Sequence, residues 1–312
     1  MADKMKFEHK PVLFKETIDS LDIQPDGTYI DGTMGGGGHS EAILKKLRTG
    51  ILLSIDRDPD AMDAAQKRLF GYRSSIRVMG EYCDMIDIAN SQGIMGVDGV
   101  LLDIGVSSYQ LDNPQRGFSY HHDSLLDMRM SKSGESAAEL INNASQKELS
   151  DIIFRYGEDK NARRIAAAIA SAREKAEIKT TGSLAEIIKE SVPAAVRRNP
   201  GHPARKTFQA IRIAVNDELG QLEKGLNAAF EILNPGGRLA VITFHSLEDR
   251  IVKQKMNSWC EGCVCPKDFP VCVCGQKPKG KLIYKKGITA AQEELNENPR
   301  SRSARLRVFE KY

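Results

Sequence analysis

Two carboxylates and a glycine-rich loop are the residues of this chain best suited to hold a nucleoside. A short apolar run at residues 29–30 leads into Asp31, and four consecutive glycines follow at residues 35–38. A second apolar run, residues 51–55, ends at Asp56. Glycine tolerates positive φ and lets the backbone approach a ligand closely. A carboxylate at the tip of the second strand can accept hydrogen bonds from ribose hydroxyls. We therefore predict a pocket for a nucleoside cofactor.

The loop departs from the sequences that bind dinucleotides or nucleoside triphosphates. Ser40 or Glu41 stands where the third glycine of G-x-G-x-x-G would be, and no Gly-Lys-Ser/Thr follows. Asp31 at the loop entrance would repel a pyrophosphate, whereas it could face the ammonium and sulfonium groups of S-adenosylmethionine. The pattern favours a methyltransferase that uses this cofactor. The alternative is a glycine-rich turn that only connects a strand to a helix.

Polar side chains after a third apolar run, residues 97–102, could hold the methyl acceptor. An exocyclic base amine delocalises its lone pair into the ring, so side chains that accept its N–H hydrogen bonds return electron density to the nitrogen. We predict Asp103 and Ser107 as catalytic residues on this ground. In an alternative role, Asp103 and Gln110 hold the cofactor from the side opposite Asp56. In a third, Asp103 only caps the next segment.

The acceptor is more consistent with nitrogen than with carbon. Methylation of a pyrimidine ring carbon usually needs a cysteine nucleophile. Cys83 lacks a Pro-Cys context, and we interpret it as a small buried apolar residue. The amino-methylating D-P-P-Y pattern is absent as well, because residues 103–106 read Asp-Ile-Gly-Val. These residues alone leave the acceptor open.

His245 follows the last strong parallel strand and is a third candidate catalytic residue. It could donate a hydrogen bond or move a proton, and Phe244 could stack on an extruded base. The alternative is a structural histidine at a strand end. We expect Ser246 to be the N-cap of the helix that follows.

The remaining cysteines cluster near the C-terminal end, at positions 260, 263, 265, 272 and 274. In a cytoplasmic protein such thiols are reduced or bind zinc. The spacing does not match the usual paired C-x-x-C knuckles. We therefore predict no metal site.

Apolar runs that alternate with helical patterns predict the architecture. The runs at residues 51–55, 76–79, 97–102 and 238–244 read as strands, and residues 60–69 read as a helix. The fold class is therefore α/β, a doubly wound mostly parallel sheet with ligands at the carboxyl ends of its strands. Between about residues 104 and 206 only helical patterns occur, at residues 136–156, 161–176 and 183–191. A long amphipathic run at 207–233 follows. We predict a core at 1–112, an inserted all-helical substrate-recognition domain at 113–206, and the second part of the core at 207–312.

Charge points to a polyanionic partner. The chain of 312 residues carries 45 Lys and Arg against 42 Asp and Glu, a net charge of +3. Residues 275–312 hold ten basic and four acidic residues, and residues 191–216 hold five basic residues and no acid. Such patches fit RNA, although solvated surfaces are the alternative. No membrane-length apolar stretch and no apolar segment behind the N-terminus occur, so we expect a cytoplasmic protein.

Longer motifs give a specific resemblance. One of them is DGTMGGGGHS at residues 31–40. The others lie at residues 9–13, 55–59, 101–111, 116–119, 126–130, 203–219, 234–250 and 301–308. In this order they resemble the MraW family of ribosomal RNA small subunit methyltransferases over essentially the whole chain. The resemblance implies an S-adenosylmethionine-dependent enzyme that methylates N4 of one cytidine in the decoding region of 16S rRNA. It implies a class I methyltransferase core with an inserted helical domain, and 16S rRNA or the small ribosomal subunit as partner.

The resemblance also implies cofactor contacts at seven positions: Gly37, Gly38, His39, Asp56, Tyr82, Asp103 and Gln110. Two positions depart from the family pattern. Tyr82 stands where the family generally has phenylalanine, which keeps a stacking face. Tyr109 replaces a proline, which frees φ and adds an N–H donor next to Gln110.

Two other classes of protein remain alternatives at this stage. One is a nicotinamide-dependent oxidoreductase on the same sheet, against which the missing third glycine counts. The other is a non-catalytic RNA-binding protein with a vestigial pocket. The sequence leaves open the oligomeric state, with a homodimer as one option, the form in which the rRNA is bound, and the residue that takes the amine proton.

Overall fold

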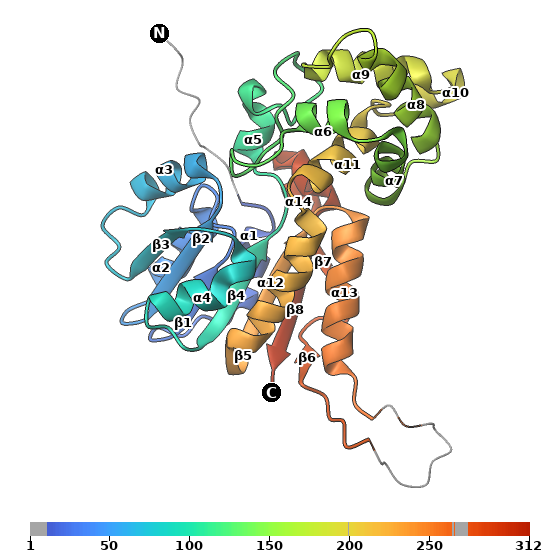
Figure 1. The fold of residues 1–312 in the computed structure, drawn as a ribbon. Coiled ribbons are helices and arrows are strands. Elements are labelled where there is room, and N and C mark those ends of the chain that lie inside the picture. The colour runs from blue at the N-terminus through green and yellow to red at the C-terminus, as the bar shows by residue number, and fades with distance from the viewer. Residues whose placement is uncertain (1–10, 199, 264, 266–273) are drawn as a thin grey trace. The chain divides into compact units, whose positions relative to one another are not determined.

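The computed structural model describes residues 11–198, 200–263, 265 and 274–312 (Figure 1). The chain divides into two compact units. The sheet unit comprises the residues up to Gly105 together with Leu219–Tyr312, and the helical unit comprises Val106–Glu218. Among the described residues, no helix has the length and apolar character that a bilayer crossing requires.

The sheet unit is built on eight strands in the order β3-β2-β1-β4-β5-β8-β6, with β7 paired to β8. Neighbouring strands from β3 to β5 are parallel, whereas β8 is antiparallel to β5, β6 and β7. The predicted doubly wound, mostly parallel sheet is confirmed. The strand bounds are β1 Thr28–Asp31, β2 Ile51–Asp56, β3 Ser75–Met79, β4 Val97–Asp103, β5 Leu233–Thr243, β6 Gly280–Leu282, β7 Ile288–Thr289 and β8 Arg305–Lys311.

Helices cover both faces of this sheet, as parallel strands require. Successive strand residues point to opposite faces, so Leu52 and Leu101 lie in one apolar core and Leu53 and Leu102 in the other. The first core is closed by α1 Phe14–Ser20, α2 Gly38–Lys46 and α3 Pro59–Arg68. The second is closed by α4 Met85–Ser91, α12 Glu218–Ile232 and α13 Ser246–Cys260. The remaining elements of the unit are η1 Tyr82–Asp84, α14 Gln292–Glu297 and η3 Pro299–Ser303.

The helical unit has its own apolar core. Its elements are α5 Ser108–Asp112, η2 Pro114–Arg116, α6 Ala137–Asn143, α7 Gln146–Gly157, α8 Ala162–Arg173, α9 Thr181–Ser191, α10 Ala194–Arg197 and α11 Arg205–Val215. The predicted helical segment at 136–156 is two helices, because Ser145 and Glu148 form a capping box that begins α7. The unit extends beyond the predicted boundaries 113 and 206, since Leu111 packs against its core and Phe208 and Ile211 belong to it.

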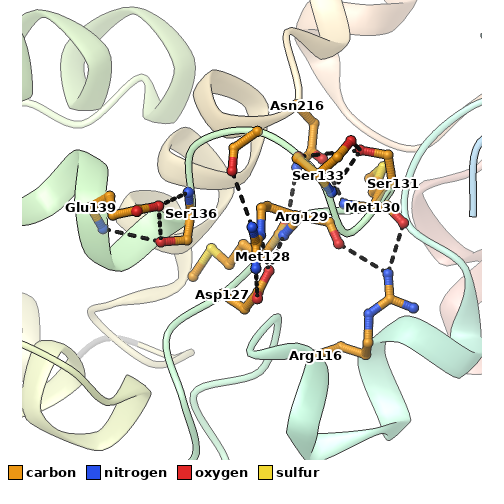
Figure 2. A network of polar contacts seen from close by, with 11 residues as sticks. Arg116, Asp127, Met128, Arg129, Met130, Ser131, Ser133, Ser136, Glu139 and Asn216 are labelled. Carbon is orange, nitrogen blue, oxygen red and sulfur yellow. Dashed lines mark hydrogen bonds and ion pairs between the residues drawn. The ribbon is translucent and has the colours of Figure 1, made fainter.

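The amphipathic run at residues 207–233 forms most of two helices, α11 and α12. α11 ends at Val215 and α12 begins at Glu218, because Asp217 has a φ of 45°. Asn216 at this break belongs to a polar network of the helical unit (Figure 2). Its Nδ2 donates to the Met128 carbonyl at 2.7 Å, and its Oδ1 accepts from the Met130 amide at 2.8 Å.

The same network fixes the loop that carries the motif at residues 126–130. Buried Arg116 donates through Nη2 to the carbonyls of Arg129 and Met130 at 3.0 and 2.8 Å. Arg129 forms a two-point ion pair with Asp127, at 2.9 Å from Nε and 2.7 Å from Nη2 (Figure 2). This arrangement gives the motif residues an architectural role inside the helical unit.

Candidate cofactor and acceptor site

The loop after β1 is organised by a buried acid. Asp31 accepts hydrogen bonds from the Ser40 hydroxyl at 2.6 Å and from the Thr33 amide at 3.2 Å. Burial raises the pKa of Asp31 to about 6, although these two hydrogen bonds oppose the shift. Both carboxylate oxygens therefore serve the conformation of the glycine loop.

Asp56 joins that loop to the end of β2. Its Oδ2 accepts from the Gly35 amide at 2.7 Å, where Gly35 has a φ of +51°, and its Oδ1 accepts from the Asp58 amide at 2.8 Å. Burial raises the pKa of Asp56 to about 6. The side chain is half-buried rather than enclosed. A carboxylate offers about four lone-pair positions, so two backbone contacts leave capacity for the ribose hydroxyls that we predicted here.

The glycines at the start of α2 are required by close packing. Gly37 is the N-cap residue with a φ of 77°. A Cβ on Gly38 would lie 2.5 Å from Cγ of Pro11. The first turn of α2 therefore approaches the N-terminal segment more closely than a side chain would allow. The amides of that turn favour a negative group, such as the carboxylate of S-adenosylmethionine.

His39 and Asp103 bring α2 and β4 together. Nδ1 of buried His39 lies 3.6 Å from Oδ2 of Asp103, and the imidazole stacks on Phe14 with ring centroids 5.8 Å apart. The Asp103 amide donates to the Thr33 hydroxyl at 2.6 Å. Both predicted residues thus lie at the same edge of the sheet, and Thr33 is a supporting residue that sequence reasoning missed.

The Asp103 carboxyl is the most strongly perturbed acid of this edge. Burial raises its pKa to about 8, and the negative charges of Asp31 and Glu248 add to the shift. Its Oδ1 is buried and has no hydrogen-bond partner among the residues that the structure describes. Such a group is stabilised by a hydrogen-bond donor or a positive charge.

Tyr82 lies in η1 with 9% of its surface exposed. A Cβ on Gly225 of α12 would lie 2.4 Å from two atoms of the tyrosine ring, so α12 covers the ring at contact distance. The ring belongs to the core beneath α4 and α12. Its predicted place beside the adenine stays a prediction.

His245 caps α13, and the prediction that Ser246 is the N-cap is wrong. Nδ1 of His245 accepts from the Glu248 amide at 3.4 Å, while Oε2 of Glu248 accepts from the amides of Phe244 and His245 at 2.8 and 3.2 Å. Nε2 of His245 lies 3.0 Å from Oε1 of the same carboxylate. The imidazole thus replaces the hydroxyl of a usual capping box. Its predicted catalytic role stays a prediction beside this structural one.

Ser107 and Gln110 belong to the helical unit, where they form the capping box of α5. The Gln110 amide donates to the Ser107 hydroxyl at 3.2 Å, and Oε1 of Gln110 accepts from the Ser107 amide at 2.9 Å. Gln110 is only 4% exposed. The predicted roles of these two residues toward acceptor and cofactor stay predictions.

The carboxyl ends of β1, β2 and β4 therefore form an acidic edge that fits a cation. Asp31, Asp56 and Asp103 all have raised pKa values, and one Asp103 oxygen lacks a described hydrogen-bond partner. S-adenosylmethionine carries positive charge on its sulfonium and ammonium groups and two ribose hydroxyls. The chemistry of these side chains matches that molecule.

Glu248 was missed in the sequence, although its spacing of three from His245 is that of a capping box.

Comparison with known proteins decides the family. The sequence pattern of the MraW methylase family matches residues 6–312. The chain belongs to the MraW methylase family. It is 53% identical over 310 residues to a ribosomal RNA small subunit methyltransferase H from Lachnospira eligens, with 98% of each chain covered. The corresponding protein from Symbiobacterium thermophilum is 52% identical over 311 residues, again with 98% of each chain covered.

Membership confirms the resemblance that the motifs predicted. The protein is a methyltransferase, and S-adenosylmethionine is its cofactor. Bound, this cofactor supplies a methyl group activated on a sulfonium sulfur. The residues predicted to hold it in the sheet unit are Gly37, Gly38, His39, Asp56, Tyr82 and Asp103, with Gln110 in the helical unit.

Proposed function

We propose that this methyltransferase methylates the N4 amine of a cytidine in the decoding region of 16S rRNA, in the free RNA or in the small ribosomal subunit. The observation that carries the proposal is the similarity to relatives named ribosomal RNA small subunit methyltransferase H, at more than half identity over 98% of the chain. Membership of the methylase family agrees with an acidic strand edge whose chemistry fits the cofactor.

The chemistry of the edge supports an amine acceptor. An exocyclic amine becomes a better nucleophile when its N–H groups donate to firmly held oxygens. Asp103 is held by the contact of its amide with Thr33 and has an oxygen without a described partner. Its carboxylate can therefore accept an N–H hydrogen bond of the base, or balance the charge of the cofactor. Ser107 remains the second residue that we predict accepts a hydrogen bond from the base amine.

Ring-carbon methylation is disfavoured by the state of the cysteines. Burial raises the pKa of the Cys83 thiol to about 12, and Asp84 contributes to the shift. A thiol with such a pKa is not a thiolate nucleophile at neutral pH. The other described cysteines start at Cys260, the last residue of α13. Because α13 begins beside the acidic edge and has 15 residues, it carries them about 22 Å away.

The helical unit offers a surface that suits RNA. It contains a cavity of about 460 Å³ lined by Lys189, Arg197, Gly201, His202 and Pro203. The imidazole of His202 stacks on Tyr120 with ring centroids 4.7 Å apart. Basic side chains next to aromatic rings are typical of nucleic-acid contacts. This supports the proposal that the helical unit recognises the substrate.

Several basic residues that we interpreted as RNA contacts have internal partners instead. Arg212 forms a two-point ion pair with buried Glu218 at 2.7 and 2.9 Å. In the predicted basic tail, Arg307 pairs with Asp249 at 2.7 and 3.0 Å. Nζ of Lys311 donates to three backbone carbonyls, the nearest that of Leu233 at 2.6 Å. The tail is thus partly a strand of the sheet, because β8 carries these residues.

Mass spectrometry of small-subunit RNA tests the proposal. RNA from cells that lack this protein should have lost N4-methylcytidine from one decoding-region fragment, and the wild-type chain should restore it. A chain with Asp103→Ala should bind RNA but fail to restore the modification. Persistence of N4-methylcytidine in the deleted cells would show that the assignment is wrong. RNA binding without transfer of a labelled methyl group would favour the non-catalytic alternative.

A further inference from the structure

We propose that Cys263, Cys265 and Cys274 bind a zinc ion as thiolates. Their three Sγ atoms lie within 4.8 Å of one another, and those of Cys263 and Cys274 are 3.7 Å apart. The sequence spacing had led us to predict no metal. The structure, however, brings together cysteines from both sides of an excursion between α13 and β6.

The sulfur separation matches a tetrahedral thiolate site. With Zn–S bonds of about 2.3 Å, the edge of a tetrahedron of sulfur ligands is about 3.8 Å. The 3.7 Å between Cys263 and Cys274 agrees with that edge. It exceeds the about 2.05 Å of a disulfide bond by far. Soft thiolate ligands select zinc over magnesium or calcium.

The surrounding chain explains why a metal is needed there. The excursion is closed at its base, where the Lys279 amide donates to the Trp259 carbonyl at 2.7 Å and a Cβ on Gly262 would lie 3.3 Å from Pro278. Beyond that base, Cys263, Cys274 and the described residues 275–279 are exposed. They bury no apolar core, and small segments without a core are commonly held by a structural metal. In Figure 1 the described residues 261–263 continue from the end of α13, and residues 274–279 lead into β6.

Zinc binding here is structural rather than catalytic. The length of α13 separates the cysteines from the acidic edge. Each thiol that forms a Zn–S bond releases its proton to solvent, with no change of oxidation state. Zinc takes four ligands, and the three described thiolates supply three of them. Cys272 lies outside the described residues and receives no role.

Two other cysteines provide matched controls. Burial raises the pKa of the Cys260 thiol, and it raises that of Cys83 to about 12. Both thiols are therefore disfavoured as thiolate ligands. Neither belongs to the three-sulfur cluster.

Metal analysis of the full, untagged chain tests the proposal. The chain is purified under reducing conditions, treated with a chelator, reconstituted with zinc sulfate, and desalted against a weak chelating indicator. We expect about one zinc per chain in the wild type and in C83S and C260S, and loss of that zinc in C263S, C265S and C274S. Absence of retained zinc in the wild type, or retention in all three cluster variants, would overturn the proposal.

Cobalt substitution keeps the test independent of folding in the variants. Co²⁺ added to the wild-type chain should give thiolate-to-metal charge-transfer bands, and zinc should remove them. A spectrum without such bands would contradict thiolate ligation, and iron in the freshly purified chain would contradict the choice of zinc. Binding of S-adenosylmethionine should be unchanged in C274S, because the cluster lies far from the acidic edge.

Discussion

Nδ1 of His39 lies 3.6 Å from Oδ2 of Asp103 and so joins the first turn of α2 to the end of β4. Through this contact the glycine loop lies at the same edge of the sheet as Asp103, which we predict accepts a hydrogen bond from the base amine. The same edge holds Asp31 and Glu248, whose charges oppose ionisation of Asp103. A cation bound there stabilises the ionised carboxylate.

Cofactor affinity should therefore depend on pH. In the free protein the pKa of Asp103 is about 8, so below that pH the carboxyl is mostly neutral, and binding a cation beside it releases a proton. Affinity for S-adenosylmethionine should rise by up to about tenfold per pH unit up to about pH 8, then level off. S-adenosylhomocysteine, which lacks the sulfonium charge, should show a shallower rise. Calorimetry between about pH 6.5 and 9 measures both slopes, and an unchanged slope in Asp103→Asn would contradict this account.

The two roles of His245 can be separated by substitution. His245→Ala removes the acceptor for the Glu248 amide and should lower the free energy of unfolding by about 1 kcal/mol. His245→Asn keeps an acceptor at the N-cap and should recover most of that loss. Denaturant unfolding and initial methyl-transfer rates are measured on both variants. A stable His245→Asn protein without methyl transfer would establish the catalytic role, whereas full activity would leave only the cap.

The Asn216 contacts should control the stability of the helical unit. Asn216→Ala removes the partners of the Met128 carbonyl and the Met130 amide (Figure 2). Buried groups that lose their hydrogen bonds cost about 1–3 kcal/mol. Ser133→Ala, an exposed position of the same network, should change the free energy of unfolding by less than about 0.5 kcal/mol. Equal unfolding midpoints for the two variants would refute the assignment.

The basic cavity of the helical unit should contribute to RNA affinity. Arg197→Ala removes a positive charge from its lining, and Lys189→Ala removes one that pairs with Glu186 at 3.0 Å. Each should weaken binding of a small-subunit RNA fragment, and Arg197→Ala should reduce the slope of log affinity against log salt by about one, Lys189→Ala by less. Lys160→Ala, an exposed charge elsewhere in the unit, serves as the control. Filter binding at several salt concentrations tests this, and identical slopes for all three variants would exclude the cavity from the interface.

The strands of the sheet could be predicted from local apolar runs, whereas contacts between residues far apart in the sequence could not. The apolar runs before Asp56 and Asp103 predicted β2 and β4, because parallel strands buried on both faces read as continuous apolar runs. The break at Asp217 was hidden, since the amphipathic period continues across it. The partner of Arg307 was equally hidden, because Asp249 lies far away in the sequence.

The sequence predicted the acidic residues of the site but not the residues that hydrogen-bond to them. Carboxylates at strand ends are visible in a sequence, so Asp56 and Asp103 could be assigned to one edge. Thr33 and Ser40 were missed because a hydroxyl beside a carboxylate has no spacing signature. The cap at His245 was misassigned to Ser246, since serine is the commoner capping residue.

The order of the strands has a consequence for how this chain acquires its structure. β4 and β5 are neighbours, with Val100 opposite Leu239, yet the entire helical unit lies between them in the chain. During synthesis the helical unit, whose contacts are local, can assemble before β5 to β8 have been synthesised. Until β5 emerges from the ribosome, β4 offers an open edge to other chains. Slow elongation through the insert would therefore prolong the interval in which the nascent protein is most prone to aggregate.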